Sequence, residues 1–270
     1  MGIRLCSLSS GSSGNCVFVG NDDSGVLVDC GVSGKEILNN LKNIGVCTST
    51  IKAVMVTHEH SDHIRSVGII SRKLGIPIYA NINTWNSMAS LIGEVKPENI
   101  RYFAVGEELE IEGIGIRTFS IPHDAADPVG YCFYEGNRKI SIATDLGYFS
   151  DTVRENISGS DMVMLEANHD VEMLKAGRYP YFLKRRILGN EGHLSNEAAG
   201  NAVYELLQTG VREVLLGHLS KENNFPELAY ETVKSILEEK KVKVNQDIKL
   251  ELAPRSSVSR CYYVEQKKAE

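Results

Sequence analysis

The sequence predicts an α+β fold in which two β-sheets pack face to face with helices on their outer sides. Two observations support this prediction. Strand-like apolar runs are followed by amphipathic helices, and this order occurs twice along the chain. No low-complexity tract, proline-rich linker or sharp change of composition divides the 270 residues. We therefore expect a single domain, residues 1–270, with two similar halves at roughly 1–145 and 146–270.

The elements of the first half follow from apolar periodicity and from turn residues. Apolar runs predict strands at residues 4–8, 16–19, 26–29, 53–57 and 76–80. Ser33 and Glu36 form a capping box that opens a helix, and Gly45 ends it. A second helix is expected from residue 62 to residue 74, where Gly75 stops it.

The second half repeats this order. Residues 101–144 alternate as strands separated by turn signals. Further strands are expected at residues 162–166 and 213–216, and amphipathic helices at residues 195–208 and 226–241. Because strands again precede helices, the second half is expected to build the second sheet and its outer helices.

The composition is that of an ordinary globular protein, with 42% hydrophobic and 24% charged residues. The net charge of −6 argues against a uniformly basic nucleic-acid coat but allows local basic patches. No run of 18 apolar residues suggests a membrane span, and the N-terminus lacks the pattern of a signal peptide. The cysteines contain no CxxC pair, so we expect a reduced, cytoplasmic protein with free, mostly buried thiols. They are Cys6, Cys16, Cys30, Cys47, Cys132 and Cys261.

A dense run of imidazoles and carboxylates directly follows the apolar stretch at residues 53–57. The run is His58-Glu59-His60-Ser61-Asp62-His63. No core needs this run, because each buried imidazole without a partner costs free energy. Imidazoles and carboxylates that converge after a strand are what a divalent transition metal ion requires. His58 and His60 point to one side of an extended backbone, whereas the adjacent Asp62 and His63 can reach a second ion.

Three more candidate ligands each lie just past an apolar run, where strand ends present side chains to a cleft. They are His123, Asp145 and His218. For a single histidine after a strand, a hydrogen-bonded structural role is the ordinary interpretation. Here the cluster at residues 58–63 needs ligands from elsewhere in the chain, and this need favours metal binding.

These residues together resemble the metallo-β-lactamase superfamily of binuclear hydrolases, and the resemblance spans nearly the whole chain. It implies a four-layer αββα fold and two divalent metal ions, with a hydroxide between them as the nucleophile. One ion would be held by His58, His60 and His123. The other would be held by Asp62, His63 and His218. Asp145 would bridge the ions, and Asp29, at a strand end, matches an early aspartate that supports the metal loop.

The metal identity stays open, because histidines favour Zn²⁺ whereas carboxylates and phosphate chemistry also suit Mn²⁺. Glu166 and His193 are similar to a pair in the superfamily's tRNA 3′-processing ribonucleases. There the carboxylate orients the imidazole, which protonates the leaving oxygen. Phosphodiester cleavage needs such an acid, and thioester or lactone hydrolysis does not. This chain has Leu194 where the family pattern has serine, and a structural or helix-capping role for the pair is the alternative.

A basic segment with interleaved aromatic residues follows Glu166 in the sequence. Lys184, Arg185 and Arg186 are candidates for phosphate contacts, and a solvated helix face is the alternative. His169 and Arg255 are weaker candidates for substrate contacts, and Asp62 is counted with Glu166 and His193 among the catalytic residues.

The sequence is further similar to the WalJ/YycJ (VicX) subgroup, which accompanies a two-component system of the cell wall. The shared features are the Ser/Gly loop before Asn15 and the segments 166–170 and 192–196. The resemblance implies a 5′-to-3′ exonuclease acting on DNA. Two alternatives stay open. One is a small-molecule thioesterase or lactonase on the same metal site, and the other is a regulatory partner of a sensor kinase with a structural metal site. No long inserted second domain and no matching cysteine ligand are present, so neither a two-domain ribonuclease nor a β-lactam hydrolase is expected.

Overall fold

The computed structural model describes residues 2–264, which form two seven-stranded β-sheets. The first sheet has the strand order β14-β1-β2-β3-β4-β5-β6. Its strands are β1 (Ile3–Ser9), β2 (Cys16–Gly20), β3 (Gly25–Val28), β4 (Ile51–Met55), β5 (Ile78–Ala80), β6 (Ile100–Tyr102) and β14 (Tyr262–Val264). The second sheet has the order β13-β12-β11-β10-β9-β8-β7. Its strands are β7 (Glu108–Ile111), β8 (Ile114–Ser120), β9 (Val129–Glu135), β10 (Arg138–Ala143), β11 (Met162–Glu166), β12 (Glu213–Gly217) and β13 (Lys249–Leu252).

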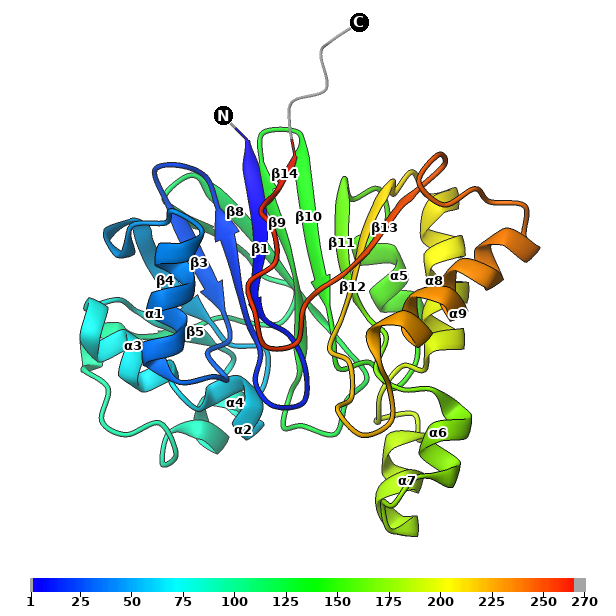
Figure 1. The fold of residues 1–270 in the computed structure, drawn as a ribbon. Coiled ribbons are helices and arrows are strands. Elements are labelled where there is room, and N and C mark those ends of the chain that lie inside the picture. The colour runs from blue at the N-terminus through cyan, green and yellow to red at the C-terminus, as the bar shows by residue number, and fades with distance from the viewer. Residues whose placement is uncertain (1, 265–270) are drawn as a thin grey trace, which may run out of the picture.

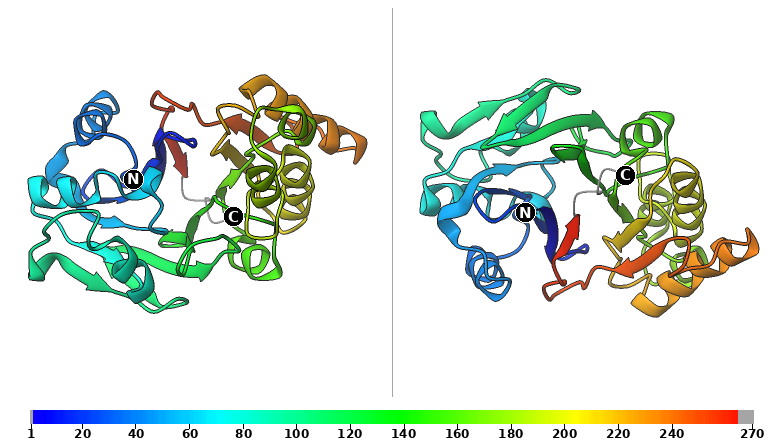
Figure 2. Two further views of the ribbon diagram at one scale, coloured as in Figure 1. Left: turned by 90° about the horizontal axis from the view of Figure 1, so that it is seen from below. Right: turned by 90° about the horizontal axis from the view of Figure 1, so that it is seen from above.

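Helices cover the outer face of each sheet (Figures 1 and 2). The first sheet is covered by α1 (Gly34–Asn43) and α3 (Val67–Leu74), and the second by α5 (Asp151–Ile157), α8 (Asn196–Gln208) and α9 (Pro226–Glu239). The other helical segments are α2 (Ser61–Ile64), α4 (Ile82–Met88), α6 (Val171–Ala176), α7 (Tyr181–Ile187), η1 (Thr48–Thr50) and η2 (Pro97–Asn99). Over residues 2–264, none of the helices has the length and apolarity needed to cross a bilayer.

Three layers of buried side chains separate these four structural layers. Along β1, Leu5 packs between the two sheets with Tyr131, whereas Leu8 packs beneath α1 with Ile37. This division follows from the alternation of side chains along a strand. A third apolar layer, which includes Leu165, lies between the second sheet and its helices. The α+β prediction of two packed sheets flanked by helices is therefore confirmed.

The two sheets share one pattern of strand directions. From β14 to β6, and again from β7 to β13, three antiparallel pairings are followed by three parallel ones. The strands of the first pattern run to β6 and those of the second begin with β7, between residues 102 and 108. The first sheet also takes its edge strand, β14, from the far end of the chain.

The predicted helix over residues 62–74 is wrong in one respect, because the structure breaks it into α2 and α3. The backbone of Cys30 lies against the break, where its N–H donates to His63 O and its carbonyl accepts from Ser66 N. These groups are therefore not available to a continuous helix. The predicted start of the helix at Ser33 is confirmed, since Ser33 Oγ accepts from Glu36 N, which is one of the two bonds of a capping box.

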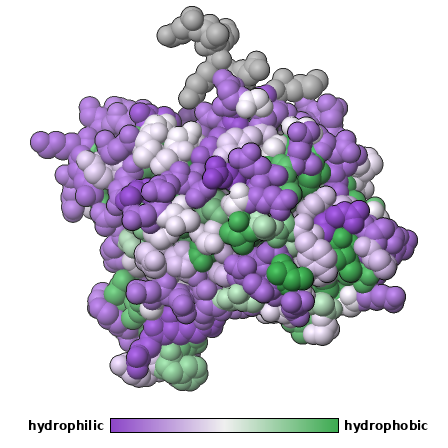
Figure 3. Space-filling view, turned by 180° about the vertical axis from the view of Figure 1, so that it is seen from behind, coloured by the Kyte–Doolittle hydropathy of each residue, from purple (hydrophilic) through white to green (hydrophobic). Residues whose placement is uncertain are grey.

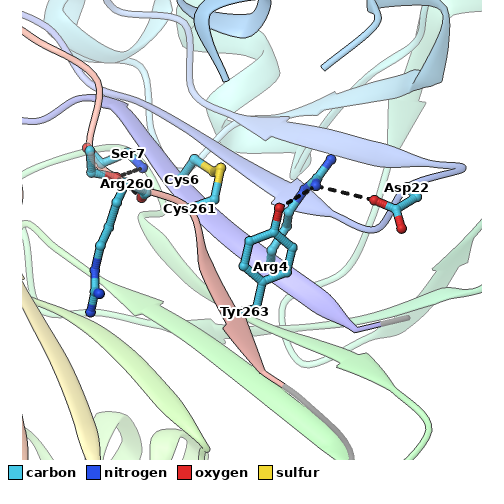
Figure 4. Close-up of a disulfide and its surroundings, with 8 residues drawn as sticks. Arg4, Cys6, Ser7, Asp22, Arg260, Cys261 and Tyr263 are labelled. Carbon is cyan, nitrogen blue, oxygen red and sulfur yellow. Dashed lines mark hydrogen bonds and ion pairs between the residues drawn. A yellow bond between two sulfur atoms is a disulfide. The ribbon is translucent and has the colours of Figure 1, made fainter. Parts of the chain in front are cut away.

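The expectation that all cysteines are free is also corrected. Cys6 and Cys261 form a disulfide that joins β1 to the residue before β14 (Figure 4). The antiparallel pairing sets Leu5 opposite Tyr262, so the next residues of the two strands face each other, with Cα atoms 4.7 Å apart. The absence of a CxxC pair concerns cysteines close together in the chain, and it cannot exclude a disulfide whose cysteines are 255 residues apart. Among the described residues, the free cysteines are Cys16, Cys30, Cys47 and Cys132, of which only Cys47 is exposed.

Candidate metal centre and its acid pair

The predicted ligands come together at one edge of the two packed sheets. His58 follows β4, His123 follows β8, Asp145 follows β10 and His218 follows β12, while Glu166 is the last residue of β11. In Figure 1 this edge lies at the bottom, beside α2 and α6. The fold thus brings all seven predicted metal ligands into adjoining groups.

The first group consists of three imidazoles. His60 Nδ1 lies 3.1 Å from His58 Nε2 and 3.3 Å from His123 Nε2. A tetrahedral ion with metal–nitrogen bonds of about 2.0–2.1 Å holds its ligand atoms about 3.3–3.4 Å apart. Both distances from His60 Nδ1 are therefore close to the spacing between two corners of such a site.

The second group contains Asp62, His63 and His218. Asp62 Oδ2 lies 3.6 Å from His63 Nε2 and 3.8 Å from His218 Nε2. The Asp145 carboxylate stands between the two groups, with Oδ1 3.7 Å from His123 Nε2 and Oδ2 3.5 Å from His63 Nε2. This placement is the one that a bridging carboxylate needs.

Unpaired buried atoms test whether a cation fits this site. Asp145 Oδ2 and His218 Nε2 are both buried, and neither has a hydrogen-bond partner among the described residues. A buried polar atom without a partner costs about 1–3 kcal/mol, and more when the group is charged. A bound cation would satisfy both atoms, so the donor set fits a pair of divalent ions.

A second layer of groups orients the ligand imidazoles. The Asp29 carboxylate lies 2.8 Å from His63 Nδ1 and accepts hydrogen bonds from both the backbone N–H and the hydroxyl of Thr57. His123 Nδ1 lies 3.0 Å from Gly192 O, which sets that nitrogen as a donor and leaves Nε2 for a metal. Contacts of this kind fix the tautomer and ring direction of metal-bound histidines.

Three of the residues at this edge have a left-handed backbone, which is uncommon for residues other than glycine. They are Asp29 (φ 59°), Asp145 (φ 62°) and His218 (φ 55°). Each directly or nearly follows a strand, and the turn aims its side chain back toward the ligand cluster. Such conformations cost about 1–3 kcal/mol each and persist where surrounding contacts enforce them. The fold therefore stores strain at this site.

Close packing also places a glycine under the metal loop. A Cβ on Gly31 would lie 1.6 Å from Asp62 O, so no side chain fits at this position. Gly31 and its neighbour Asn15 hold the loop from below, since Asn15 N donates to Asp62 O and Gly31 N donates to Asn15 O.

Glu166 and His193 form a contact pair beside the second ligand group. Glu166 Oε1 lies 2.9 Å from His193 Nδ1 and 2.7 Å from His218 Nδ1. The other oxygen, Oε2, accepts from the backbone N–H groups of Leu146 and Leu194. Although burial opposes ionisation, the imidazoles of His193 and His218 hold the Glu166 pKa well below its usual range. This fully buried carboxylate thus orients a ligand and a neighbouring imidazole at once, a dual contact that the sequence did not indicate.

Two further polar residues at the site escaped the sequence analysis. Asn15 Nδ2 lies 3.1 Å from His63 Nε2 and 3.4 Å from Asp62 Oδ2. Asp124 Oδ1 lies 3.6 Å from His123 Nε2. Asp124 adjoins a predicted ligand, and Asn15 ends a Ser/Gly loop, but neither position in the sequence indicates proximity to an ion.

The basic segment lies on α7, and its three cations have different surroundings. Arg186 forms a two-bond ion pair with Asp124, through Nε–Oδ2 and Nη2–Oδ1. Lys184 donates from Nζ to a backbone carbonyl of α6 at 2.7 Å. Arg185 is exposed and lies over the ring of Tyr181. Arg186 therefore attaches α7 to the loop that follows β8 and contains His123, while Arg185 faces solvent.

The two weaker candidates, His169 and Arg255, are placed less favourably for contact with a nucleic-acid strand. His169 is 1% exposed, and neither ring nitrogen has a hydrogen-bond partner among the described residues. Burial lowers its pKa to about 4, so the ring is neutral. Arg255 donates from Nη2 to Ser220 O, and its carbonyl accepts from Ser9 Oγ and Ser10 N. Arg255 thus packs against the loop between β1 and β2. His169 is too deeply buried for a nucleic-acid strand to reach it in this conformation.

Comparison with known proteins decides the family. The model of the β-lactamase superfamily domain matches residues 25–219. The chain belongs to this superfamily. It is 42% identical over 240 residues to exodeoxyribonuclease YycJ of Bacillus anthracis, covering 89% of this chain and 91% of that protein. It is 39% identical over 252 residues to exodeoxyribonuclease WalJ of Streptococcus pneumoniae serotype 2, covering 93% and 94%.

The fold of this superfamily member matches solved structures at low sequence identity. The metallo-β-lactamase fold protein YhfI from Bacillus subtilis gives a TM-score of 0.71 at 17% identity, covering 96% of this chain and 99% of that one. The metallo-β-lactamase fold, and the subgroup that the motifs indicated, are therefore confirmed.

Proposed function

We propose that this protein is a metal-dependent exonuclease that hydrolyses the phosphodiester bonds of DNA from the 5′ end. The observation that carries the proposal is the Glu166–His193 pair, which stands beside the ligand cluster and offers an acid to a poor leaving group. The similarity to proteins named exodeoxyribonucleases supports DNA as the substrate. We also propose that the protein acts in the cytoplasm, where chromosomal DNA is reached directly.

The seven ligands would hold two divalent ions, Zn²⁺ or Mn²⁺, in the two groups described above. Such ions supply Lewis acidity toward the phosphate and activate water as a nucleophile. Asp62 is 27% exposed at its side chain, whereas Asp145 is 3% exposed, so Asp62 is the ligand carboxylate that meets substrate. His193 donates a proton to the leaving oxygen, and Glu166 orients His193 for this step.

The α6–α7 lobe would guide the nucleic acid to this site. It projects from the body at the bottom right of Figure 1, and from behind it carries apolar atoms at its tip among hydrophilic ones (Figure 3). Tyr181 and Phe182 are 76% and 73% exposed on α7, next to Lys184 and Arg185. Exposed aromatic rings stack on bases, and cations neutralise phosphates.

We assign different roles to the remaining candidates for substrate contact. Because Arg186 is bound to Asp124, we propose that its main role is to position α7. Only the guanidinium nitrogen that Asp124 does not bind would contact the phosphate. Arg255 is proposed to act through the β1–β2 loop that it contacts. His169 is proposed to act indirectly, because its backbone carbonyl accepts from Asn196 N, three residues after His193.

Nuclease profiling tests the proposal directly. The metal-free protein, reloaded with Mn²⁺ or Zn²⁺, should degrade linear single-stranded or duplex DNA with a free 5′ end and leave circular DNA intact. DNA labelled at the 3′ end should shorten stepwise, and the variant His58→Ala should lose both bound metal and this activity. RNA, thioester and lactone substrates serve as comparisons.

Two results would contradict the proposal. Hydrolysis of a thioester or lactone with no cleavage of DNA would favour the small-molecule hydrolase. Full metal content without turnover of any tested substrate would favour a regulatory protein with a structural metal site.

A further inference from the structure

Two cavities adjoin each other at the ligand cluster. The first, here called the α7 cavity, has a volume of about 360 Å³ and lies between His193 and α7. The second, here called the Arg65 cavity, has a volume of about 500 Å³ and lies between the β1–β2 loop, α2 and Leu91. Ser12, Ser61 and Asp62 line both, so the two cavities meet at the metal site. A strand bound across the site therefore has two distinct compartments available.

The α7 cavity offers a ring and apolar side chains to a base and a sugar, beside polar groups of the metal site. Tyr179, Leu183 and Ile187 form one wall. His193 and the candidate ligands His60, Asp62 and His218 form another. Its arginine, Arg186, is already neutralised by an ion pair with a carboxylate. Its volume lies at the lower end of the range for small-molecule pockets, about 300–1,000 Å³. These properties suit one nucleotide rather than a run of phosphates.

The Arg65 cavity combines an apolar wall, formed by Ile64 and Leu91, with a cation and several hydroxyl groups. Arg65 is exposed at the end of α2, and among residues 2–264 its guanidinium makes no ion pair or side-chain hydrogen bond. The hydroxyls of Ser12, Ser13 and Ser61 line the same space. An unpaired guanidinium next to hydroxyl donors binds phosphate oxygens well, because such hydrogen bonds are charge-assisted.

The position of the proposed acid, His193, decides which part of the DNA strand lies in which cavity. Hydrolysis adds water to phosphorus and breaks the bond from phosphorus to the 3′ oxygen of the terminal nucleotide. His193 gives its proton to that oxygen, the proton of the attacking water passes to solvent, and no electrons are transferred. The products are a terminal nucleotide with a 3′ hydroxyl and a shortened strand with a 5′ phosphate. The leaving oxygen, and hence the terminal nucleotide, must therefore lie on the side of His193.

We propose that the α7 cavity receives the 5′-terminal nucleotide that leaves, and that the Arg65 cavity receives the strand that is retained. This inference rests on the proposed exonuclease function. Arg65 would contact the phosphate that follows the scissile one, and Leu183 would contact the departing nucleotide.

Substrate length separates the two cavities. A dinucleotide with a 5′ phosphate fills the α7 cavity but has no phosphate after the scissile one, whereas a 12-mer fills both. Arg65→Ala should lower kcat/KM on the 12-mer about 10-fold, mainly through KM, and leave the dinucleotide nearly unchanged. It should also reduce the salt slope of 12-mer binding by about 1. Arg65→Lys should restore part of the loss.

The cavity-filling variant Leu183→Trp gives the opposite pattern. It should lower kcat/KM by a similar factor on the dinucleotide and on the 12-mer, since both place their terminal nucleotide in the α7 cavity. Leu183→Ala provides a second variant if the larger side chain disturbs α7, and it should also affect both substrates equally. Arg212→Ala is the matched control for loss of an arginine, because Arg212 precedes β12 at the end opposite the metal site.

The outcomes separate this inference from the function on which it rests. If the wild-type protein cleaves no DNA, the proposed function fails. If it cleaves DNA but Arg65→Ala slows both substrates equally while Leu183→Trp slows only the 12-mer, the assignment of the two cavities is reversed and this inference is wrong.

Discussion

Replacing His193 by alanine should slow DNA cleavage strongly while metal binding is retained. The imidazole contacts Glu166 through Nδ1 and lines the α7 cavity, but it belongs to neither the first nor the second metal ligand triad as proposed here. The seven ligands and their contacts with Asp29 and Gly192 remain intact in the variant. The change therefore removes the acid and leaves the proposed metal centre in place.

The size of the effect follows from the role of a general acid. A positioned acid contributes about 10²–10⁴-fold to the rate. At about 1.36 kcal/mol for each factor of ten, this loss corresponds to about 3–5 kcal/mol of transition-state stabilisation. Because Glu166 Oε1 holds His193 Nδ1 at 2.9 Å, the imidazole is already oriented, and we expect the loss in kcat rather than in KM.

A change of leaving group isolates the proton transfer. A natural DNA strand expels a strongly basic alkoxide, whereas a nitrophenyl ester of a nucleotide expels a weakly basic phenolate that needs no proton. His193→Ala should therefore be slow on DNA and nearly as fast as the wild type on the nitrophenyl ester. Single-turnover rates on both substrates, with metal content measured by mass spectrometry, give the comparison.

Two results would refute this reasoning. An equal loss on both substrates would show that His193 acts on binding or on the metal site rather than on the leaving oxygen. A loss of metal in parallel with activity would make His193 a ligand. Glu166→Gln is the control, because Glu166 contacts both His193 and His218. It should reduce the rate through His193 and the metal affinity through His218.

Three other predictions test the surroundings of the metal. Asp29→Ala should weaken metal binding about 10–100-fold, measured by titration with a chelator, because the variant frees the His63 imidazole; unchanged affinity would remove Asp29 from the supporting groups. Gly31→Ala should lower the free energy of unfolding by about 3 kcal/mol in urea, since its Cβ would overlap the backbone of Asp62; a normal urea midpoint would contradict the close packing described here. Cys6→Ser should lower the free energy of unfolding by about 5 kcal/mol in the chain-entropy model, and reductant should bring the wild type to the same midpoint; a wild type that does not respond to reductant would show that the disulfide is not formed in solution.

The sequence indicated the candidate ligands, which the fold brings together, because the chemistry is concentrated. His58 to His63 are contiguous, and His123, Asp145 and His218 each follow an apolar strand, so position after a strand was enough to find them. Glu166 and His193 needed a family resemblance, because neither residue is unusual in its own segment.

Long-range packing explains what the sequence did not predict. Asn15 reaches the metal loop only because β2 lies beside β3 and the β1–β2 loop folds under Asp62. The break between α2 and α3 depends on the backbone of Cys30, more than 30 residues earlier. Arg186 was a candidate for phosphate contact, but Asp124 forms an ion pair with it from the loop after β8. Contacts of this kind leave no local pattern in the sequence.

The placement of β14 has a consequence for how the protein is made. The first sheet is otherwise complete at β6, yet its edge strand is translated only after residues 103–261. At about 5–20 residues per second, the outer edge of β1 stays open for roughly 8–30 s on the ribosome. An open strand edge pairs readily with other chains. The arrival of Tyr262–Val264 covers the edge of β1 and leaves a three-residue edge strand in its place, and a very short edge strand offers little for another chain to pair with.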